Sequence, residues 1–249
     1  MAKLNDIVNF LNRELDVKKI KDDSKNGLQV KGSNKVNKIA FGVDACMELF
    51  EKTKEKKCDM AIVHHGLLWK KQKNFGDIKK KRIEFLKKNK ISLYAVHLPL
   101  DKDIKYGNNI EIAKLIGLKK IKPFAKYDGV KIGYYGYKNT TINELIKISK
   151  SKVNKKTIIH DFGKNKIKKI GVVSGSAPEI VLQCKKLKID AFVSGEPRHS
   201  YFHINKENRI NVFYCGHYKT ETYGVKALMN PLKQKFNIET VFIDTPTNL

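Results

Sequence analysis

The chain has 249 residues, of which 41% are hydrophobic and 31% are charged; this balance is typical of a globular protein and excludes an intrinsically disordered one. Its formal net charge is +26, a field that attracts phosphates, nucleic acid or acidic partners. The sequence has neither an apolar segment long enough to cross a bilayer nor an apolar stretch of the signal-peptide kind after Met1. We therefore expect a soluble, cytoplasmic protein with no membrane partner.

The basic residues are almost all lysines, because only Arg13, Arg82, Arg198 and Arg209 are arginines. Surfaces that read bases or clamp phosphates favour the planar guanidinium group. The even spread of lysine therefore favours a compositional bias, and non-specific binding of nucleic acid remains an alternative. The four cysteines are scattered and form no CxxC pair, which favours reduced thiols over a thiolate metal site.

Hydrophobic spacing in the first half of the chain predicts alternating helices and strands. In chain order, the predicted elements are a helix over residues 4–15, strands at 39–43 and 60–63, a helix at 78–86, a strand at 91–96, and a helix at 110–116 that Gly117 closes.

The second half shows the same rhythm. Its predicted elements are a strand at 130–137, a helix at about 141–150, strands at 170–173, 191–193 and 212–214, a helix at 217–235, and a strand at 241–243. Thr140 or Thr141 is the expected cap of the helix at 141–150, with Glu144 in a capping box. Pro178 is expected at the first position of a further helix.

Short apolar strands separated by helices predict the α/β fold class, with mainly parallel or mixed sheets flanked by helices. The segment at 119–129, which contains Pro123 and Gly129, is the candidate domain boundary.

The first chemical motif is His64-His65, directly after the apolar run at 60–63. In open α/β sheets, ligands bind outside the carboxyl ends of strands. Neighbouring side chains on a continuing strand point to opposite faces, so we expect the chain to leave the strand here, helped by Gly66, and the two imidazoles to converge. The alternative is an ordinary His-His loop.

The second motif follows the strand at 91–96. Asp101 is expected at the same sheet edge, and its carboxylate suits a divalent metal. The alternative is a structural cap. His97 is expected to be a supporting hydrogen-bond partner or a core histidine, rather than a ligand.

The third motif is the pair His217 and Glu221, at the start of the predicted helix 217–235. A spacing of four residues places both side chains on one helical face, as in metal-binding helices. The alternative is an ion pair in the first turn. Together, three histidines and two carboxylates exceed the needs of one tetrahedral zinc, and two metals about 3.5–4 Å apart would share a bridging carboxylate, for which Glu221 is our choice.

Seven segments of the chain resemble, in order, motifs of the Nif-three-like family, whose members are often labelled GTP cyclohydrolase I type 2 homologues. The segments are Asn26-Gly27-Leu28-Gln29-Val30, Gly42-Val43-Asp44, Val63-His64-His65-Gly66-Leu67, His97-Leu98-Pro99-Leu100-Asp101, Gly107-Asn108-Asn109, Ser194-Gly195-Glu196 and Gly216-His217-Tyr218-Lys219-Thr220-Glu221. One departure is Gly66-Leu67, where many relatives have proline after the second histidine; this removes no ligand.

The resemblance implies a dinuclear centre of divalent metals (Zn, Fe, Mn, Co or Ni). Its ligands would be His64, His65, Asp101, His217 and Glu221. The resemblance also implies a toroidal homohexamer and two α/β domains, here residues 1–125 plus 210–249 and the smaller 126–209.

Glu196 becomes, through the same resemblance, a candidate catalytic acid or base, with a carboxylate that stabilises a helix start as the alternative. We also assign His97 a candidate role in proton transfer. The segment 174–177 could cradle a phosphate at a helix start, although a plain turn between strand and helix fits it better.

Three functions are compatible with these residues. The first is a metal-dependent hydrolase of the GTP cyclohydrolase type 2 kind, acting on a nucleotide or a cyclic amide. The second is a metal-handling protein that loads or inserts a metal without turnover. The third is a basic toroid that binds nucleic acid, which the +26 charge suggests.

Overall fold

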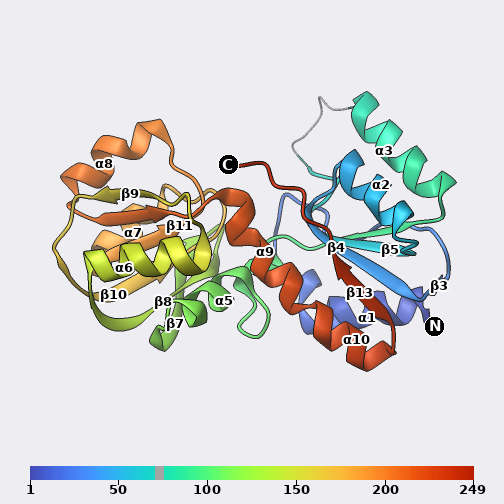
Figure 1. Ribbon diagram of the computed structural model, residues 1–249, viewed down its shortest axis with the longest axis horizontal. Helices are drawn as coiled ribbons and strands as arrows, with labels where there is room; N and C mark the ends of the chain where they lie inside the picture. Colours follow the sequence, from blue (N-terminus) through green and yellow to red (C-terminus); the bar gives the residue numbers. More distant parts are fainter. Residues whose placement is uncertain (71–75) are drawn as a thin grey trace. The chain divides into compact units, whose positions relative to one another are not determined.

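The computed structural model describes residues 1–70 and 76–249. The chain divides into two compact units, in each of which helices cover a β-sheet (Figure 1). Unit 1 comprises Met1–Leu100 and Val225–Thr245, and unit 2 comprises Asp101–Gly224 and Pro246–Leu249. The predicted α/β fold class is confirmed. In the described part of the chain, no helix combines the length and apolarity needed to cross a membrane.

Unit 1 contains a five-stranded sheet in the order β13-β4-β5-β6-β2. Its four strands β13, β4, β5 and β6 are mutually parallel, and β2 joins β6 antiparallel. The elements are β1 (Ala2–Lys3), α1 (Leu4–Glu14), a 3-10 turn (Val17–Lys19), β2 (Gly27–Val30), β3 (Lys35–Val36), β4 (Lys38–Asp44), α2 (Met47–Glu55), β5 (Met60–His65), α3 (Gly76–Lys88), β6 (Ser92–Ala95), α10 (Met229–Phe236) and β13 (Glu239–Phe242). The short helix α4 (Leu98–Lys102) spans the boundary to unit 2.

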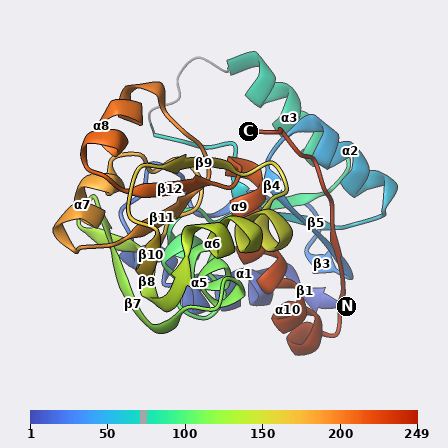
Figure 2. The same cartoon turned by 60° about the vertical axis from the view of Figure 1, so that its left-hand side comes forward.

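Unit 2 contains a six-stranded mixed sheet in the order β7-β8-β10-β11-β12-β9 (Figure 2). Only β10, β11 and β12 run parallel to one another, and the three other strands pair antiparallel. The elements are α5 (Asn108–Leu115), β7 (Lys119–Tyr127), β8 (Val130–Thr141), α6 (Ile142–Ile148), a π-helical turn (Ser149–Val153), β9 (Ile158–Asp161), β10 (Lys166–Val172), α7 (Ile180–Lys186), β11 (Ala191–Ser194), a 3-10 turn (His199–Tyr201), α8 (Phe202–Glu207), β12 (Asn211–Tyr214) and α9 (His217–Ala227), whose last turn belongs to unit 1.

Each sheet is held by an apolar core, because the central parallel strands are buried on both faces. In unit 1, Leu49 of α2 and Leu86 of α3 pack with Val63 of β5. In unit 2, Leu145 of α6 packs with Val193 of β11. The predicted capping box is present, since Thr141 accepts a hydrogen bond from the backbone N–H of Glu144 and the Glu144 carboxylate accepts one from the Thr141 N–H.

The division between the units differs from the domains expected from sequence. The segment 101–125 belongs to unit 2, because β7 pairs along its length with β8. The segment 210–224 also belongs to unit 2, because β12 is inserted between β11 and β9. The stretch at 119–129 is thus a strand and a turn within unit 2, rather than a boundary.

Two helix predictions also differ in detail. The helix expected over 217–235 is two helices, α9 and α10, separated at Leu228. Pro231 explains the break, because it has no N–H to donate to the carbonyl four residues earlier. Pro178 lies before α7, which begins at Ile180, so it is not at the first helical position. Strands β2, β7 and β9 were missed; all three lie at sheet edges, where polar residues weaken the hydrophobic pattern.

Candidate metal centre

The three histidines of unit 1 gather at the carboxyl ends of β5 and β6. Strand β5 continues through His64 to His65, which pairs with Asp44 of β4, so the prediction that the chain leaves the strand before His64 is wrong. The imidazoles nevertheless lie close together, with ring centroids 4.7 Å apart. The ring of His97 lies 5.0 Å from that of His64 and 5.6 Å from that of His65. One nitrogen of each ring lies within 4.8 Å of the others, a spacing that can hold a metal ion.

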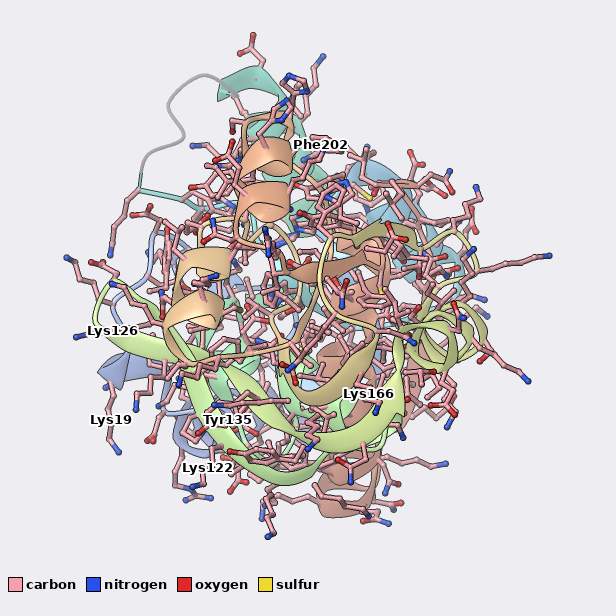
Figure 3. The ribbon with its side chains drawn as sticks, turned by 90° about the vertical axis from the view of Figure 1, so that its left-hand side faces the viewer. Lys19, Lys122, Lys126, Tyr135, Lys166 and Phe202 are labelled. Carbon is pink, nitrogen blue, oxygen red and sulfur yellow. The ribbon has the colours of Figure 1, made fainter. Side chains whose placement is uncertain are left out.

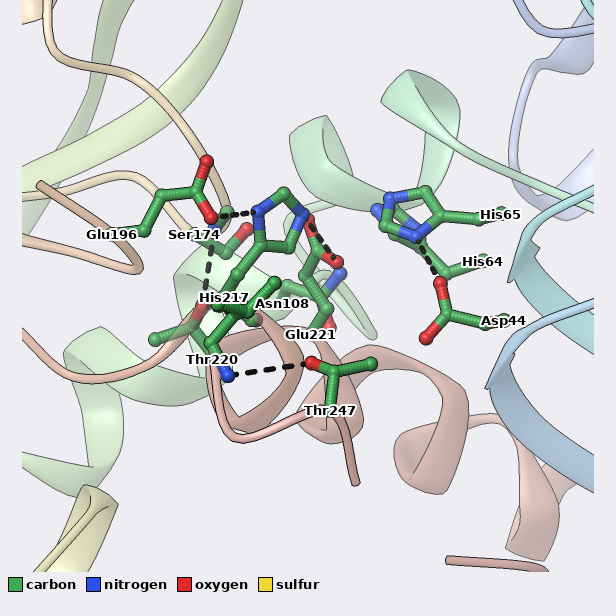
Figure 4. A network of polar contacts seen from close by, with 12 residues as sticks. Asp44, His64, His65, Asn108, Ser174, Glu196, His217, Thr220, Glu221 and Thr247 are labelled. Atoms are coloured by element: carbon green, nitrogen blue, oxygen red, sulfur yellow. Dashed lines mark hydrogen bonds and ion pairs between the residues drawn. The ribbon is translucent and has the colours of Figure 1, made fainter. Parts of the chain in front are cut away.

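The Nδ1 atoms of His64 and His65 are both engaged by oxygen acceptors. His64 Nδ1 lies 3.0 Å from the carbonyl oxygen of Val96, and His65 Nδ1 lies 2.8 Å from Oδ1 of Asp44 (Figure 4). A carbonyl or a carboxylate only accepts hydrogen bonds, so Nδ1 carries the proton in both rings. With the proton on Nδ1, it is Nε2 that can bind a metal, and an acceptor at Nδ1 is the usual outer partner of a metal-binding histidine.

His97 is held in a similar way. Its Nδ1 lies 3.0 and 3.2 Å from the two carboxylate oxygens of Asp22, and its backbone N–H donates to Oδ1 of Asn26 at 2.7 Å. Burial alone would raise the pKa of Asp22, but the hydrogen bond and charge of His97 outweigh it and lower the pKa to about 2. Asp22 therefore fixes the orientation of His97 beside His64 and His65.

In unit 2, helix α9 begins at His217 and brings Glu221 to the same face one turn later. Nε2 of His217 lies 3.2 Å from Oε2 of Glu221, and its Nδ1 lies 3.1 Å from Oε2 of Glu196 in the loop after β11 (Figure 4). Burial would lower the pKa of His217, but Glu221 and then Glu196 outweigh it and raise the pKa to about 9. In the absence of a metal, His217 is thus a cation held by two carboxylates.

Asp101 is buried at 6% exposure and forms part of a polar network. Its Oδ1 accepts hydrogen bonds from Nδ2 of Asn108 at 2.9 Å and from Oγ of Ser174 at 3.0 Å. Oδ1 of Asn109 accepts a hydrogen bond from the backbone N–H of Ser174 at 2.6 Å. These bonds hold the Asp101 carboxylate against the loop that begins at Ser174.

The same loop connects Asp101 to the pair on α9. The N–H of Gly175 donates to Oγ1 of Thr220 at 3.0 Å, and Gly175 has a left-handed φ of +64°. A Cβ at this position would collide with Oε1 of Glu221. The segment 174–177 therefore packs against the carboxylates of Asp101 and Glu221. It is not a phosphate cradle at a helix start, because α7 begins only at Ile180.

Two residues of the site were assigned no role from sequence. Asp44 could have been predicted from the sequence, since it is a carboxylate at the end of β4, the parallel neighbour of β5. Asp22 lies in an irregular segment without periodicity, and only the fold brings it to His97.

Imidazoles that gather at the carboxyl ends of parallel strands, with oxygen acceptors at Nδ1, define an α/β protein with a candidate site for divalent metal. Comparison with known proteins gives the particular family. The chain belongs to the Duf34/NIF3 (NGG1p interacting factor 3) family, whose family model matches residues 2–248.

The relatives match over nearly their whole length. The chain is 41% identical to the GTP cyclohydrolase 1 type 2 homolog of Archaeoglobus fulgidus, over 99% of both chains. It is also 41% identical to the homolog of that name from Pyrococcus horikoshii, over 98% of this chain and 99% of the other. The crystal structure of TTHA1606 from Thermus thermophilus is similar with a TM-score of 0.90 and 36% identity, and covers 100% of both chains.

Proposed function

We propose that the protein is a metal-dependent hydrolase with a dinuclear centre of divalent ions. The ligands would be His64, His65, Asp101, His217 and Glu221. The observation that carries this proposal is the engagement of the Nδ1 atoms of His64, His65 and His217 by a carbonyl or a carboxylate, because such outer partners orient Nε2 toward a metal.

The donor set fits divalent ions of borderline hardness. Three imidazoles and two carboxylates suit Zn, Fe, Mn, Co or Ni, and the carboxylates offset the positive charge of the ions. A pair of such ions would supply Lewis acidity for the hydrolysis of a polar substrate. Glu221 is the ligand proposed to bridge them.

The surrounding residues have definable tasks in this proposal. Glu196 keeps the proton on Nδ1 of His217 and so orients that ring. Asp22 does the same for His97, which stands within reach of His64 and His65 and is proposed to move protons, or to act as a further donor. Both carboxylates would act mainly by positioning.

The substrate class is proposed from the names of the relatives. The Archaeoglobus and Pyrococcus proteins are named GTP cyclohydrolase 1 type 2 homologs, which suggests a nucleotide or a cyclic amide as the substrate. The family resemblance also leads us to propose a homohexamer, which light scattering of the purified protein would test.

The test of this function combines metal loading with turnover. The chain is freed of metal by a chelator, reloaded separately with Zn, Mn, Fe, Co or Ni, and assayed on GTP and on a panel of cyclic amides. We expect hydrolysis only in a reloaded form, and its loss in the Glu221→Gln variant. A loaded protein that binds metal tightly but converts no substrate would contradict the hydrolase proposal and favour the metal-handling alternative.

A further inference from the structure

Unit 2 contains a hollow of about 470 Å³ beside Glu196, which we call the lysine pocket. Its walls are the loop 154–156, Ile158 of β9, the loop 195–197, the first turn of α9 and the tail 246–249. We propose that the lysine pocket binds an organic phosphate that carries a flat ring, with the phosphate at Lys155, Lys156 and Lys219. The proposal rests on the function proposed above, because it places the substrate next to the candidate metal ligands.

The position of the pocket supports a role in substrate binding. It lies at the carboxyl ends of the parallel strands β11 and β12, where α/β sheets bind their ligands. Glu196 lines the pocket and also contacts Nδ1 of His217. A molecule in the pocket would therefore lie next to the ring that the proposed centre uses.

The charge of the pocket selects an anion. Three lysines line it, Lys155 and Lys156 on one loop and Lys219 on the first turn of α9. Within residues 1–70 and 76–249, none of these three ammonium groups forms an ion pair with a carboxylate. The one carboxylate side chain in the wall, Glu196, is paired with His217. A phosphate would thus meet three cations that are available for charge-assisted hydrogen bonds.

A second basic hollow of unit 2 is less suited to binding a phosphate. It has about 510 Å³ and is lined by Lys164, Lys185, Lys188 and Arg209, among others. There Lys164 forms an ion pair with Asp190 at 2.8 Å, and Lys185 donates to the carbonyl of Asn208 at 3.3 Å. Part of its charge is therefore already used within the protein.

The other walls of the lysine pocket suit a ring. Tyr214 and Tyr218 are buried, and Nδ2 of Asn205 donates a hydrogen bond to the hydroxyl oxygen of Tyr214 at 2.8 Å. Ile158 is 51% exposed at the rim, so a planar group laid against it would remove apolar surface from water. The volume falls within the range of roughly 300–1,000 Å³ that small-molecule sites occupy.

The test measures binding by calorimetry on chelator-treated, metal-free protein. The probes are guanosine monophosphate, guanosine and inorganic phosphate. We expect guanosine monophosphate to bind more tightly than either of the other two, because only it engages the lysines and the apolar wall together. The variant Lys155→Ala/Lys156→Ala/Lys219→Ala should weaken its binding by about tenfold or more.

The matched control removes the same charge from another surface of unit 2. Lys122, Lys166 and Lys168 are exposed on β7 and β10, and Figure 3 labels the first two. The variant Lys122→Ala/Lys166→Ala/Lys168→Ala should keep the affinity within about twofold of the parent. An equal loss in both triple variants would overturn the proposal, because it would trace binding to the overall charge of +26. Unchanged affinity in the pocket variant, or no binding of guanosine monophosphate at millimolar concentration, would also overturn it.

Separate readouts distinguish this proposal from the proposed function. Metal content and melting temperature are measured for both triple variants, and both should match the parent. Binding of guanosine monophosphate by a chain that takes up no metal would support the pocket and contradict the metal centre. Metal-dependent turnover that does not depend on the three lysines would do the reverse. If the triple variant does not fold, the single charge reversal Lys156→Glu is measured in its place, with the same expected weakening.

Discussion

The two units contain different kinds of candidate metal ligand. In unit 1, imidazoles at strand ends are held by Val96, Asp44 and Asp22, so that each ring is oriented by an oxygen acceptor. In unit 2, one imidazole on α9 lies between Glu196 and Glu221. The difference is that the candidate ligands of unit 1 are imidazoles oriented by oxygen acceptors, whereas those of unit 2 include the carboxylates that offset the charge of a divalent cation.

The largest expected effect is that of Glu221→Gln. This substitution keeps the shape of the side chain but removes the charge of the proposed bridging ligand, so we expect nearly complete loss of bound metal. Elemental analysis after gel filtration measures the effect. Glu207→Gln, at the exposed end of α8, is the control and should retain all metal. Full metal content in Glu221→Gln would break the assignment of anionic ligands to unit 2.

The next effect compares, in the two units, the carboxylates that accept a hydrogen bond from the Nδ1 atom of a candidate ligand. Asp44→Asn and Glu196→Gln each weaken the acceptor on an Nδ1 atom, of His65 and His217 respectively. We expect the metal affinity to fall by about 10–100-fold in each, with no change in stoichiometry at saturating metal. Competition with a chelator of known affinity measures this. If Glu196→Gln instead leaves the affinity unchanged and abolishes turnover, Glu196 is a catalytic acid or base rather than a positioning residue.

A smaller effect concerns stability in unit 1. The pKa of Asp22 is lowered from 3.8 to about 2, so its contribution is present above pH 4 and is lost as the pH falls toward 2. Asp22→Asn should lower the free energy of unfolding at pH 7 by about 2 kcal/mol, and the difference from the parent should shrink as the pH approaches 2.

Denaturant titrations of Asp22→Asn between pH 2 and pH 7 give these values. The exposed Asp161→Asn variant serves as the control and should show no such pH dependence. A difference between Asp22→Asn and the parent that stays constant over this range would show that Asp22 acts by packing alone.

The smallest expected effect is that of Gly175→Ala in unit 2. The left-handed backbone costs an alanine about 1 kcal/mol, and its Cβ would displace the carboxylate of Glu221. We expect a modest drop in melting temperature together with weaker metal binding. A drop in melting temperature with unaltered metal affinity would mean that the loop supports the fold but does not hold Glu221.

Much of the fold could be predicted from the sequence because its central strands are continuous apolar runs. The runs at 39–43, 60–63 and 191–193 correspond to β4, β5 and β11. The lysine-rich edge strand β7 could not be predicted, because its pairing with β8 depends on backbone hydrogen bonds that leave no hydrophobic pattern. The unit boundaries were misplaced for the same reason.

The site was predictable to the extent that it follows local rules. The spacing of His217 and Glu221 placed them on one helical face, as the structure shows. The outer partners were beyond prediction from spacing, because Asp22 and His97 are 75 positions apart in sequence and meet only through the fold. Nothing in the spacing of residues indicated that Glu196 would contact Nδ1 of His217.

The central claim is that His64, His65, Asp101, His217 and Glu221 are the ligands of two divalent metal ions, and metal content tests it most directly. Elemental analysis of the purified protein is compared with that of His65→Ala and of His217→Ala. We predict two metal ions per chain in the parent, and loss of roughly half of the metal or more in each variant. A parent that binds no metal, or a His217→Ala variant that retains the full content while His65→Ala loses it, would contradict the claim.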